Sequence, residues 1–277
     1  MRLLTPADVR ALLDRHGMRA SRALGQNFLA DPNTARRIAR LAEIEPGDAV
    51  VEVGPGIGSL TLALVEAGAD VVAIERDRHV VPLLDEVLDE ALDAEVARPH
   101  VVVADALTAD YAEILGTAAG RFTMVSNLPY NVATPLVARF LDDVPQVGRM
   151  LVMVQKEVAE RLVARPGERA AGHVSVKVAY HARASLVGVV PPTVFVPRPR
   201  VDSALVRFVR HAVPPVDADL AAMMELVRAG FGQRRKTLRR ALQSVTGAAT
   251  PALLEAAGVD PSARAEQLDL DAWARLT

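Results

Sequence analysis

Short apolar runs alternate with longer stretches of helical periodicity through the first half of the chain. Strands of a parallel sheet are covered on both faces and are therefore apolar throughout, and five runs have this character. They cover residues 49–53, 70–75, 100–105, 122–126 and 149–154. Between the first two, residues 59–67 have helical periodicity, and Gly68 ends that helix. A strand–helix–strand unit that repeats in this way predicts a doubly wound α/β sheet.

Three more apolar runs follow at closer spacing, which predicts strands added in antiparallel orientation at one edge of the sheet. They cover residues 174–180, 184–190 and 203–209. We therefore expect the first domain to span residues 1–210.

A change of pattern after residue 210 predicts a second, smaller domain. Two prolines within residues 211–217 disfavour helix and end strands, so this segment is interpreted as a linker, with Asp217 placed to cap the following helix. From Leu220 onward the periodicity is helical. The expected core positions are Leu226, Val227, Phe231, Leu238 and Leu242. We expect an all-helical domain over residues 218–277.

The composition is that of a globular protein, with 277 residues of which 51% are apolar and 24% charged. No apolar run approaches the roughly 20 residues that span a membrane, and the N-terminus lacks the apolar stretch of an export signal. We expect a cytoplasmic protein with no membrane partner, and a monomer. The absence of cysteine excludes disulfides, thiolate metal sites and cysteine nucleophiles.

The net charge of −2 conceals an uneven distribution of charge. Residues 1–40 carry eight arginines and three aspartates, a local charge of +5. A second basic cluster contains Arg228, Arg234, Arg235, Lys236, Arg239 and Arg240. Two separated basic clusters favour a polyanion as partner. The alternative is that each cluster is only the solvated face of a helix.

The first predicted strand leads into Gly54, Gly56 and Gly58 before the first helix begins. At such a junction, backbone N–H groups and the helix dipole face a ligand at the carboxyl end of the strand. A dinucleotide fingerprint has the spacing Gly-x-Gly-x-x-Gly, whereas these glycines have the spacing Gly-x-Gly-x-Gly, and Glu52 lies inside the strand. This pattern argues against a nicotinamide oxidoreductase. The alternative is a bare turn, although a turn needs fewer glycines.

Acidic residues end the next two strands. Glu75 lies 21 residues after Gly54, where a carboxylate can accept both hydroxyls of a ribose, and this suits NAD and S-adenosylmethionine equally. Asp105 ends the third strand beside the same crevice and can accept a hydrogen bond from the exocyclic amine of an adenine. The alternative for Asp105 is capping of the following turn.

The fourth strand is followed by Asn127-Leu-Pro-Tyr130. The exocyclic amine of adenine is a poor nucleophile because its lone pair is delocalised, so an enzyme that methylates it must hold it in line with the donor. The side-chain oxygen of Asn127 and a backbone carbonyl near Leu128 can accept its two hydrogens. Tyr130 can stack on a flipped-out base, a contact worth roughly 1–3 kcal/mol. A plain strand-to-helix turn is the alternative.

These motifs and others resemble the ribosomal RNA adenine N6-dimethyltransferases, most closely the bacterial branch that modifies two neighbouring adenosines near the 3′ end of 16S rRNA. They occur in order at residues 24–31 (LGQNFLAD), 51–56 (VEVGPG), 74–75 (IE), 104–106 (ADA), 127–131 (NLPYN), 155–158 (QKEV), 195–203 (FVPRPRVDS) and 231–238 (FGQRRKTL). The resemblance implies a Rossmann-like class I methyltransferase that uses S-adenosylmethionine and no metal.

The resemblance also implies roles for individual residues. Those around S-adenosylmethionine are Asn27, Leu29, Gly54, Glu75, Asp105 and Asn127. The catalytic residues are Asn127, Leu128, Pro129, Tyr130 and Phe195, the last as a second aromatic ring beside the target base. Periodicity alone leaves Phe195 equally acceptable as a core residue. The RNA-binding residues are Arg234, Arg235, Lys236, Arg239 and Arg240.

Two positions depart from the family pattern. Ser126 stands where glycine is more usual, and residues 170–173 (AAGH) replace a segment that usually carries tyrosine before its glycine. Neither departure touches the proposed acceptor pair, so they bear on substrate positioning and not on the reaction.

We therefore expect N6,N6-dimethylation of two adjacent adenosines near the 3′ end of 16S rRNA in the small ribosomal subunit. Three alternatives remain. A 23S rRNA dimethylase of the macrolide-resistance type shares the pocket motifs, although Leu128 and the segment 231–236 lean against it. A non-catalytic nucleic-acid-binding protein would not need the donor pocket. A nicotinamide oxidoreductase is opposed by the glycine spacing.

Overall fold

The computed structural model describes residues 1–20 and 25–277. Leu24 of the first motif and Arg22 of the N-terminal basic cluster lie outside the described residues. The described chain divides into two compact units, of which the first comprises residues 1–159 and 185–209 and the second residues 160–184 and 210–277. This division differs from the expected boundary at residue 210, because residues 160–184 belong with the C-terminal helices.

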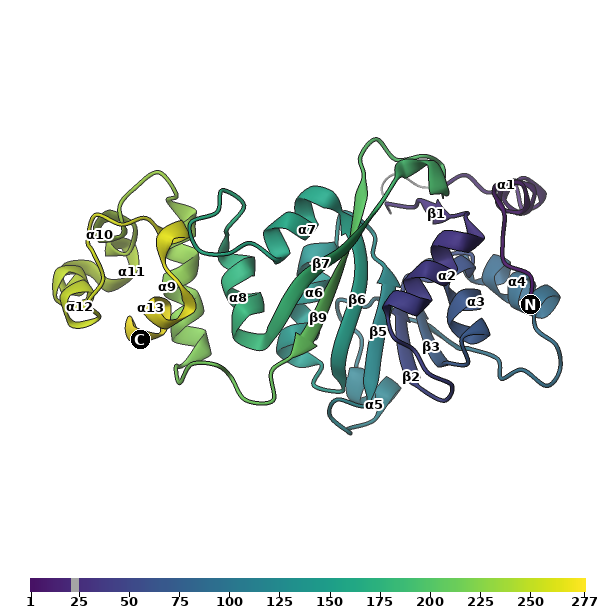
Figure 1. Cartoon of the computed structure of the whole chain (residues 1–277), viewed down its shortest axis with the longest axis horizontal. Helices are drawn as coiled ribbons and strands as arrows, with labels where there is room; N and C mark the ends of the chain where they lie inside the picture. Colours follow the sequence, from purple (N-terminus) through teal and green to yellow (C-terminus); the bar gives the residue numbers. More distant parts are fainter. Residues whose placement is uncertain (21–24) are drawn as a thin grey trace. The chain divides into compact units, whose positions relative to one another are not determined.

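A mostly parallel sheet with the strand order β4-β3-β2-β5-β6-β9-β7 forms the first unit (Figure 1). Its strands are β2 (Ala49–Val53), β3 (Asp70–Glu75), β4 (His100–Val103), β5 (Phe122–Asn127), β6 (Val147–Gln155), β7 (Ala182–Val190) and β9 (Ser203–Arg210). Strands β2 to β6 pair in parallel, whereas β9 is antiparallel to β6. The five predicted parallel strands are confirmed, and the predicted antiparallel addition is confirmed for β9.

The order of the strands determines where a ligand can enter. From the central β2 the chain first builds β3 and β4 on one side and then β5 and β6 on the other. The strand order therefore reverses between β2 and β5, and in open α/β sheets such a switch point leaves a crevice at the carboxyl ends of the strands.

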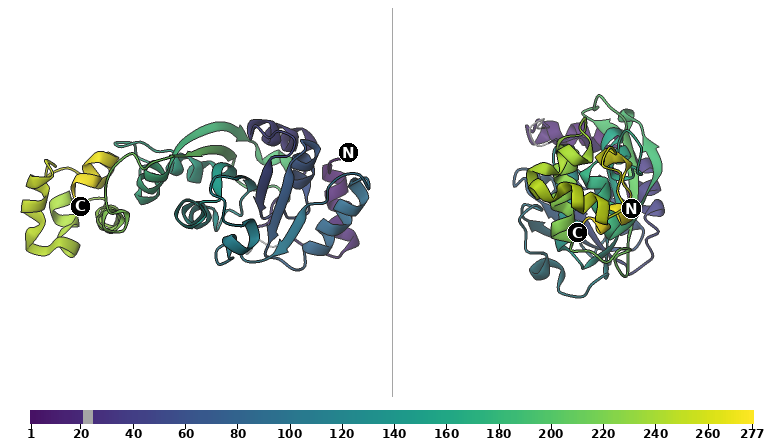
Figure 2. Two further views of the ribbon diagram at one scale, coloured as in Figure 1. Left: turned by 90° about the horizontal axis from the view of Figure 1, so that it is seen from below. Right: turned by 90° about the vertical axis from the view of Figure 1, so that its left-hand side faces the viewer.

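Helices of the first unit cover the sheet with apolar side chains. They are α1 (Pro6–Arg15), α2 (Pro32–Leu41), α3 (Ser59–Glu66), α4 (Val81–Ala91), α5 (Tyr111–Leu115) and α6 (Ala133–Asp143), and α7 (Lys156–Leu162) spans the boundary between the units. The views in Figure 2 show the same elements from two other sides. Apolar residues of α1 to α4 form one core with those of the strands, including Ile38, Leu62, Leu84 and Val125.

Local sequence signals explain where helix α2 begins. The side chain of its N-cap residue, Asp31, accepts a hydrogen bond from the Thr34 N–H at 2.6 Å, and Pro32 occupies the first helical position. Both features suit a helix start, since the first N–H groups have no partner within the helix. Immediately before this start, the two-residue strands β1 (Phe28–Leu29) and β8 (Phe195–Val196) pair in antiparallel orientation.

The predicted strand at residues 174–180 is wrong, because this segment is part of helix α8 (His173–His181). Valine at every second position suggested a strand. In the helix, however, Val174 and Val178 share one buried face four residues apart, while Val176 packs against the core of the second unit. The Ser175 hydroxyl closes the first turn by bonding the backbone N–H and carbonyl of Gly172.

The rest of the second unit is helical, as expected for the C-terminal region. Its helices are α9 (Leu220–Gly232), α10 (Leu238–Ala241), α11 (Gln243–Thr246), α12 (Thr250–Ala256) and α13 (Leu270–Arg275). The right-hand view of Figure 2 faces these helices. Asp219 caps α9 by accepting from the N–H groups of Ala221 and Ala222, so the expected cap at Asp217 is wrong by two residues. Trp273 is fully buried in this core, and Phe231 is partly buried against it.

Candidate active site

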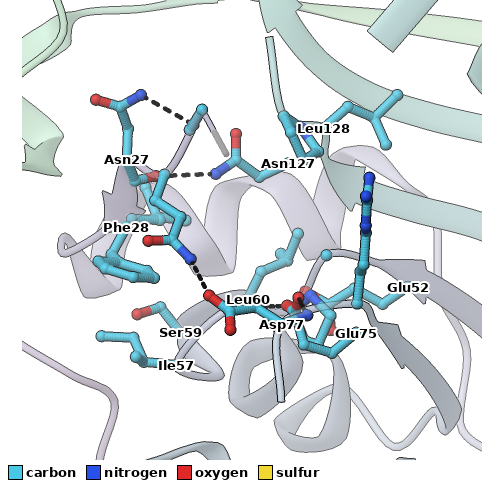
Figure 3. A pocket seen from close by; sticks show the side chains of 18 of the residues that line it. Asn27, Phe28, Glu52, Ile57, Ser59, Leu60, Glu75, Asp77, Asn127 and Leu128 are labelled. Atoms are coloured by element: carbon cyan, nitrogen blue, oxygen red, sulfur yellow. Dashed lines mark hydrogen bonds between the residues drawn. The ribbon is translucent and has the colours of Figure 1, made fainter. Parts of the chain in front are cut away.

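A cavity of about 400 Å³ lies at the carboxyl ends of the strands (Figure 3). The loops that follow β2, β3 and β5 form it together with residues 25–29, which precede α2. Five of the six predicted donor-site residues line it, namely Asn27, Leu29, Gly54, Glu75 and Asn127. The cavity therefore occupies the crevice that the strand order predicts.

The glycine loop lets the backbone approach this cavity closely. Gly54 and Gly58 have φ angles of +70° and +89°, a region that residues with a Cβ atom rarely adopt. At Gly58 a Cβ atom would also lie only 2.8 Å from the Leu84 Cδ1 atom. The tight turn leaves the Gly56 N–H directed at the Glu75 carboxylate, to which it donates at 3.1 Å.

Both carboxylate oxygens of Glu75 accept hydrogen bonds from backbone N–H groups. Its Oε2 atom accepts from the Gly56 N–H, and its Oε1 atom accepts from the Asp77 N–H at 2.8 Å. Its burial raises the pKa of this carboxyl group, and the backbone hydrogen bonds oppose the rise. Because each oxygen keeps a further lone pair, the fixed carboxylate can still accept two hydroxyl groups.

Glu52 is a second carboxyl group in the same cavity, and the sequence pattern assigned it no role at the site. It is 1% exposed, lines the cavity, and accepts a hydrogen bond from the Thr61 hydroxyl at 2.7 Å. Burial raises the pKa of Glu52 to about 8; the Thr61 hydroxyl opposes the shift and Glu75 adds to it. The sequence feature that could have identified Glu52 as a site residue is an acidic residue inside an otherwise apolar strand.

The amide of Asn127 has a defined orientation at this cavity. Its Nδ2 atom donates to the backbone carbonyl of Asn27 at 3.4 Å (Figure 3). A carbonyl can only accept, so this contact places the NH₂ group toward Asn27 and turns the side-chain oxygen away from it. The amide oxygen is therefore available to accept a hydrogen bond, and its role toward an adenine amine remains a prediction.

Several hydrogen bonds hold residues 25–29 in place at the cavity. Gln26 donates from Nε2 to the Asp77 Oδ2 atom at 2.8 Å, which joins the segment to the loop after β3. The Asn27 side chain donates to the Gly25 carbonyl at 3.2 Å, and Phe28 and Leu29 pair with β8. The sequence pattern did not single out Gln26, which lies inside the LGQNFLAD motif.

The segment after Asn127 is also held in place. Leu128 is 1% exposed and donates its N–H to the Met153 carbonyl at 3.0 Å, so its backbone is part of the sheet. The hydroxyl groups of Tyr130 and Ser203 are 2.7 Å apart, and burial raises the pKa of Tyr130. Leu128, Pro129 and Tyr130 all line the cavity, so the structure brings together the predicted segment and the donor-site residues.

Ser126, one of the two departures from the family pattern, has a structural role between β2 and β5. Its hydroxyl oxygen accepts from the Val53 N–H at 2.8 Å, and the side chain is fully buried. The two strands pair at Val50 and Val51 but separate toward the cavity, so the hydroxyl supplies a partner for a backbone donor at the point of separation.

Asp105 lies beside the cavity and does not line it. Its Oδ1 atom accepts from the Leu107 N–H at 3.0 Å, so it does cap the turn, and its Oδ2 atom lies 3.4 Å from an Arg76 guanidinium nitrogen. Arg76 itself lines the cavity. A role of Asp105 toward an adenine therefore remains a prediction.

Phe195 has the environment of a core residue. It is 3% exposed, belongs to the main apolar core of the first unit and does not line the cavity. Its backbone pairs with Leu29, which explains the burial, since β8 covers the segment that precedes α2. The role of Phe195 beside a target base, which the resemblance implied, therefore remains a prediction.

The predicted RNA-binding residues lie in the second unit and are exposed. Arg239 and Arg240 line a surface hollow with Thr237 and Gln243. Arg234 donates to the Arg169 carbonyl at 3.0 Å and lies over the Phe231 ring. The structure thus gathers these cations on one helical region.

The described residues contain neither a metal cluster nor a membrane span. Within residues 1–20 and 25–277, no three His, Asp or Glu side chains are grouped in a way that suits a metal ion. The same residues contain no helix that is both long and apolar enough to span a membrane.

Comparisons with known proteins agree on one family. The family model described as ribosomal RNA adenine dimethylase matches residues 17–277. Ribosomal RNA small subunit methyltransferase A of Thermobifida fusca is 48% identical, with 99% of this chain and 95% of the relative covered. The protein of the same name from Kineococcus radiotolerans is 50% identical, with coverage of 99% and 90%.

Solved structures show the same fold. The 23S rRNA methyltransferase ErmE has a TM-score of 0.67 at 28% identity, with 90% of this chain and 98% of that chain covered. A dimethyladenosine transferase from Plasmodium falciparum has a TM-score of 0.74 at 23% identity, with coverage of 90% and 95%. The architecture is therefore that of a Rossmann-like methyltransferase sheet with a C-terminal helical part.

Proposed function

The chain belongs to the ribosomal RNA adenine dimethylase family, and on this premise we propose that it dimethylates N6 of two adjacent adenosines near the 3′ end of 16S rRNA in the small ribosomal subunit. The methyl donor is S-adenosylmethionine. The observation that carries the proposal is the Asn127 amide, which is oriented by the Asn27 carbonyl and lines the same cavity as Glu75 and the glycine loop.

The residues around the cavity fit S-adenosylmethionine. Glu75 is fixed by two backbone N–H groups and retains acceptor capacity for the two ribose hydroxyls. We assign the glycine loop to the methionine part, and Asn27 and Leu29 line the same cavity. Asp105 would receive the adenine amine once Arg76 gives up its 3.4 Å contact.

The reaction needs orientation more than acid–base chemistry. S-Adenosylmethionine supplies an electrophilic methyl group, so the protein has to present the lone pair of the adenine amine in line with it. The Asn127 oxygen accepts one amine hydrogen, and a backbone carbonyl near Leu128 accepts the other. The Asn127 amide is hydrogen-bonded to the Asn27 carbonyl, and the Leu128 backbone is hydrogen-bonded to the sheet. Little reorganisation is therefore needed at the moment of transfer.

Tyr130 is the aromatic side chain that we assign to the target base. It lines the cavity beside Asn127, and its hydroxyl is anchored to Ser203. An anchored ring can stack on a base that has left its helix, which offsets part of the unstacking cost. Pro129, between Leu128 and Tyr130, restricts the backbone that presents both groups.

We assign the binding of folded RNA to the exposed cations of the second unit. Arg234, Arg235, Lys236, Arg239 and Arg240 contribute sequence-independent contacts to phosphates. Because the proposed substrate is ribosomal RNA, we expect the reaction to take place in the cytoplasm. We also expect the enzyme to act as a monomer.

A large-subunit substrate is the second candidate, because ErmE, named as a 23S rRNA methyltransferase, shares the fold at 28% identity. The relatives named for the small subunit are 48% and 50% identical and are matched over almost the whole chain. We therefore favour the small subunit.

The test is transfer of labelled methyl groups from S-adenosylmethionine to unmodified small subunits, large subunits and free rRNA in parallel, with the labelled base identified after digestion. We expect N6,N6-dimethyladenosine in small-subunit RNA alone. Label in 23S rRNA would favour the second candidate, and no label in any substrate would favour a non-catalytic RNA-binding protein.

A further inference from the structure

Two carboxyl groups lie on the same face of the sheet at the cavity. In the parallel pair β2–β3, Glu52 is opposite Ala73, so Glu75 is two residues further along on that face. Both side chains line the cavity and are buried, with 1% and 8% of their surface exposed. We assign Glu75 to a ribose, and no role has yet been assigned to Glu52.

The two carboxyl groups are supported differently. Glu75 accepts from two backbone N–H groups, whereas Glu52 accepts from one hydroxyl, that of Thr61. Among residues 1–20 and 25–277, no lysine or arginine lies within ion-pair distance of Glu52. A buried carboxylate with so little support is unfavourable, so the group binds a proton instead.

Several other titratable or charged groups lie around the same cavity. They are Glu75 at the end of β3 and Arg76, Asp77, Arg78 and His79 in the loop that follows it. Arg76, Arg78 and His79 are exposed at the cavity, whereas Glu52 lies inside the sheet beside Thr61 of α3. A test of Glu52 therefore needs a variant of His79 as a control, because both side chains line the cavity.

The charge in the cavity changes during the proposed reaction. The donor, S-adenosylmethionine, carries a positive sulfonium, whereas the product, S-adenosylhomocysteine, carries a neutral thioether at the same place. A positive charge nearby favours the ionised form of a buried carboxyl group, and a neutral ligand does not. The sulfonium of the donor therefore favours ionisation of Glu52 more than the thioether of the product does.

We propose that Glu52 follows the charge of the ligand: it is protonated when the cavity is empty or holds S-adenosylhomocysteine, and ionised when the cavity holds S-adenosylmethionine. Glu52 is then a specificity-determining residue that favours donor over product, without taking part in bond formation. The proposal rests on the proposed function for the identity of the donor.

Protons and charge balance in this scheme. The adenine nitrogen forms the new N–C bond with its lone pair, while the electron pair of the broken C–S bond stays on sulfur. The methylated amine loses one proton to solvent, and Glu52 binds one from solvent as the sulfonium charge disappears. Glu52 releases that proton again when a fresh donor replaces the product.

Calorimetric titration of the full-length protein in buffers of different ionisation enthalpy measures the protons exchanged on binding. At pH 7 we expect S-adenosylmethionine to release about one proton and S-adenosylhomocysteine about none. Affinity for the donor should rise about tenfold from pH 6 to pH 7 and become constant above about pH 8, while affinity for the product stays flat.

Glu52→Gln should abolish the proton release and make the ratio of the two affinities independent of pH. His79→Gln is the matched control, and it should retain the proton release at pH 7. Thr61→Val provides a second variant if Glu52→Gln does not fold: removal of the hydroxyl should move the pH at which donor affinity becomes constant upward. Thr61→Ser keeps the hydroxyl and should behave as the unmodified protein does.

Equal proton release with donor and product, or release that persists in Glu52→Gln, would overturn the proposal. Either result together with normal methyl transfer would leave the proposed function intact. Failure of S-adenosylmethionine to bind at all would instead contradict the proposed function, and this inference with it.

Discussion

The cavity of the first unit and the basic region of the second unit present polar groups in opposite ways. At the cavity, the side chains of Glu75, Asn127 and Tyr130 each have at least one defined hydrogen-bond partner within the protein. In the basic region, Arg235 and Lys236 are exposed, and within residues 1–20 and 25–277 neither side chain has a partner. The first region fixes the positions of atoms, whereas the second supplies charge.

This difference predicts different responses to mutation. Removal of one oriented atom from the cavity should have a large effect that does not depend on salt, because its neighbours cannot replace it. Removal of one exposed cation should lower RNA affinity by a small amount. This loss should add to the losses from other removed cations and should weaken as salt is raised.

The largest expected effect is that of Asn127→Ala on turnover. Without the amide oxygen the adenine amine has no oriented acceptor there, so we expect turnover to fall by about 10²-fold or more while RNA affinity changes only a few-fold. Single-turnover methyl transfer and RNA binding to the same substrate measure the two quantities.

Asn127→Asp tests orientation separately, since it keeps an acceptor oxygen but removes the N–H group that contacts the Asn27 carbonyl. We expect it to be impaired as well. Asn33→Ala, on an exposed position of α2, is the control and should be unchanged. Near-normal turnover of Asn127→Ala would contradict the acceptor role and remove the distinction between the two regions.

The same contrast explains what the sequence could predict. Parallel strands, the glycine loop and Glu75 depend on local patterns, and the structure confirms their arrangement at the cavity. Orientation depends on tertiary contacts: the partner of Asn127 is 100 residues away in the chain, and that of Gln26 is 51. Neither contact has a local signal.

The features that the sequence did not reveal have the same origin. Valine at every second position in residues 174–180 fits a strand and also fits two faces of a helix, and only the core of the second unit decides between them. The burial of Phe195 follows from pairing between β8 and β1, two short strands that periodicity does not reveal. Glu52 was visible as an acidic residue, but its isolation from cations was not.

A smaller effect is expected in the basic region. Replacement of Arg234, Arg235 and Lys236 by alanine should weaken RNA binding by about tenfold or more at low salt, and should reduce the salt slope by about 0.9 for each phosphate that is no longer neutralised. Binding measured over a series of salt concentrations gives both quantities. Turnover at saturating RNA should change little.

Arg264→Ala is a control from the same unit, because Arg264 is also exposed but lies outside the basic cluster. It should leave the salt slope unchanged. If the triple variant also kept the slope of the unmodified protein, the basic residues would be only a solvated helix face.

The smallest expected effect concerns stability at the cavity. The pKa of Glu52 is raised to about 8 in the folded protein, above its value in the unfolded chain, so the folded state binds the proton more tightly. Its stabilising contribution is complete below the unfolded pKa and is lost as pH rises through about 8. Glu52→Gln keeps a neutral group there, so its advantage in stability should grow with pH.

Thermal unfolding of both proteins without ligand at pH 5.5 and pH 8.5 measures this difference. We expect the midpoint of Glu52→Gln to gain several degrees on the unmodified protein between the two pH values, since about 1 kcal/mol shifts the midpoint of a chain of this size by roughly 2–4 °C. Glu45→Gln, at an exposed position, should show no such gain. A constant difference would mean that Glu52 is ionised throughout, and that even the least exposed carboxyl group of the cavity behaves like the exposed charges of the second unit.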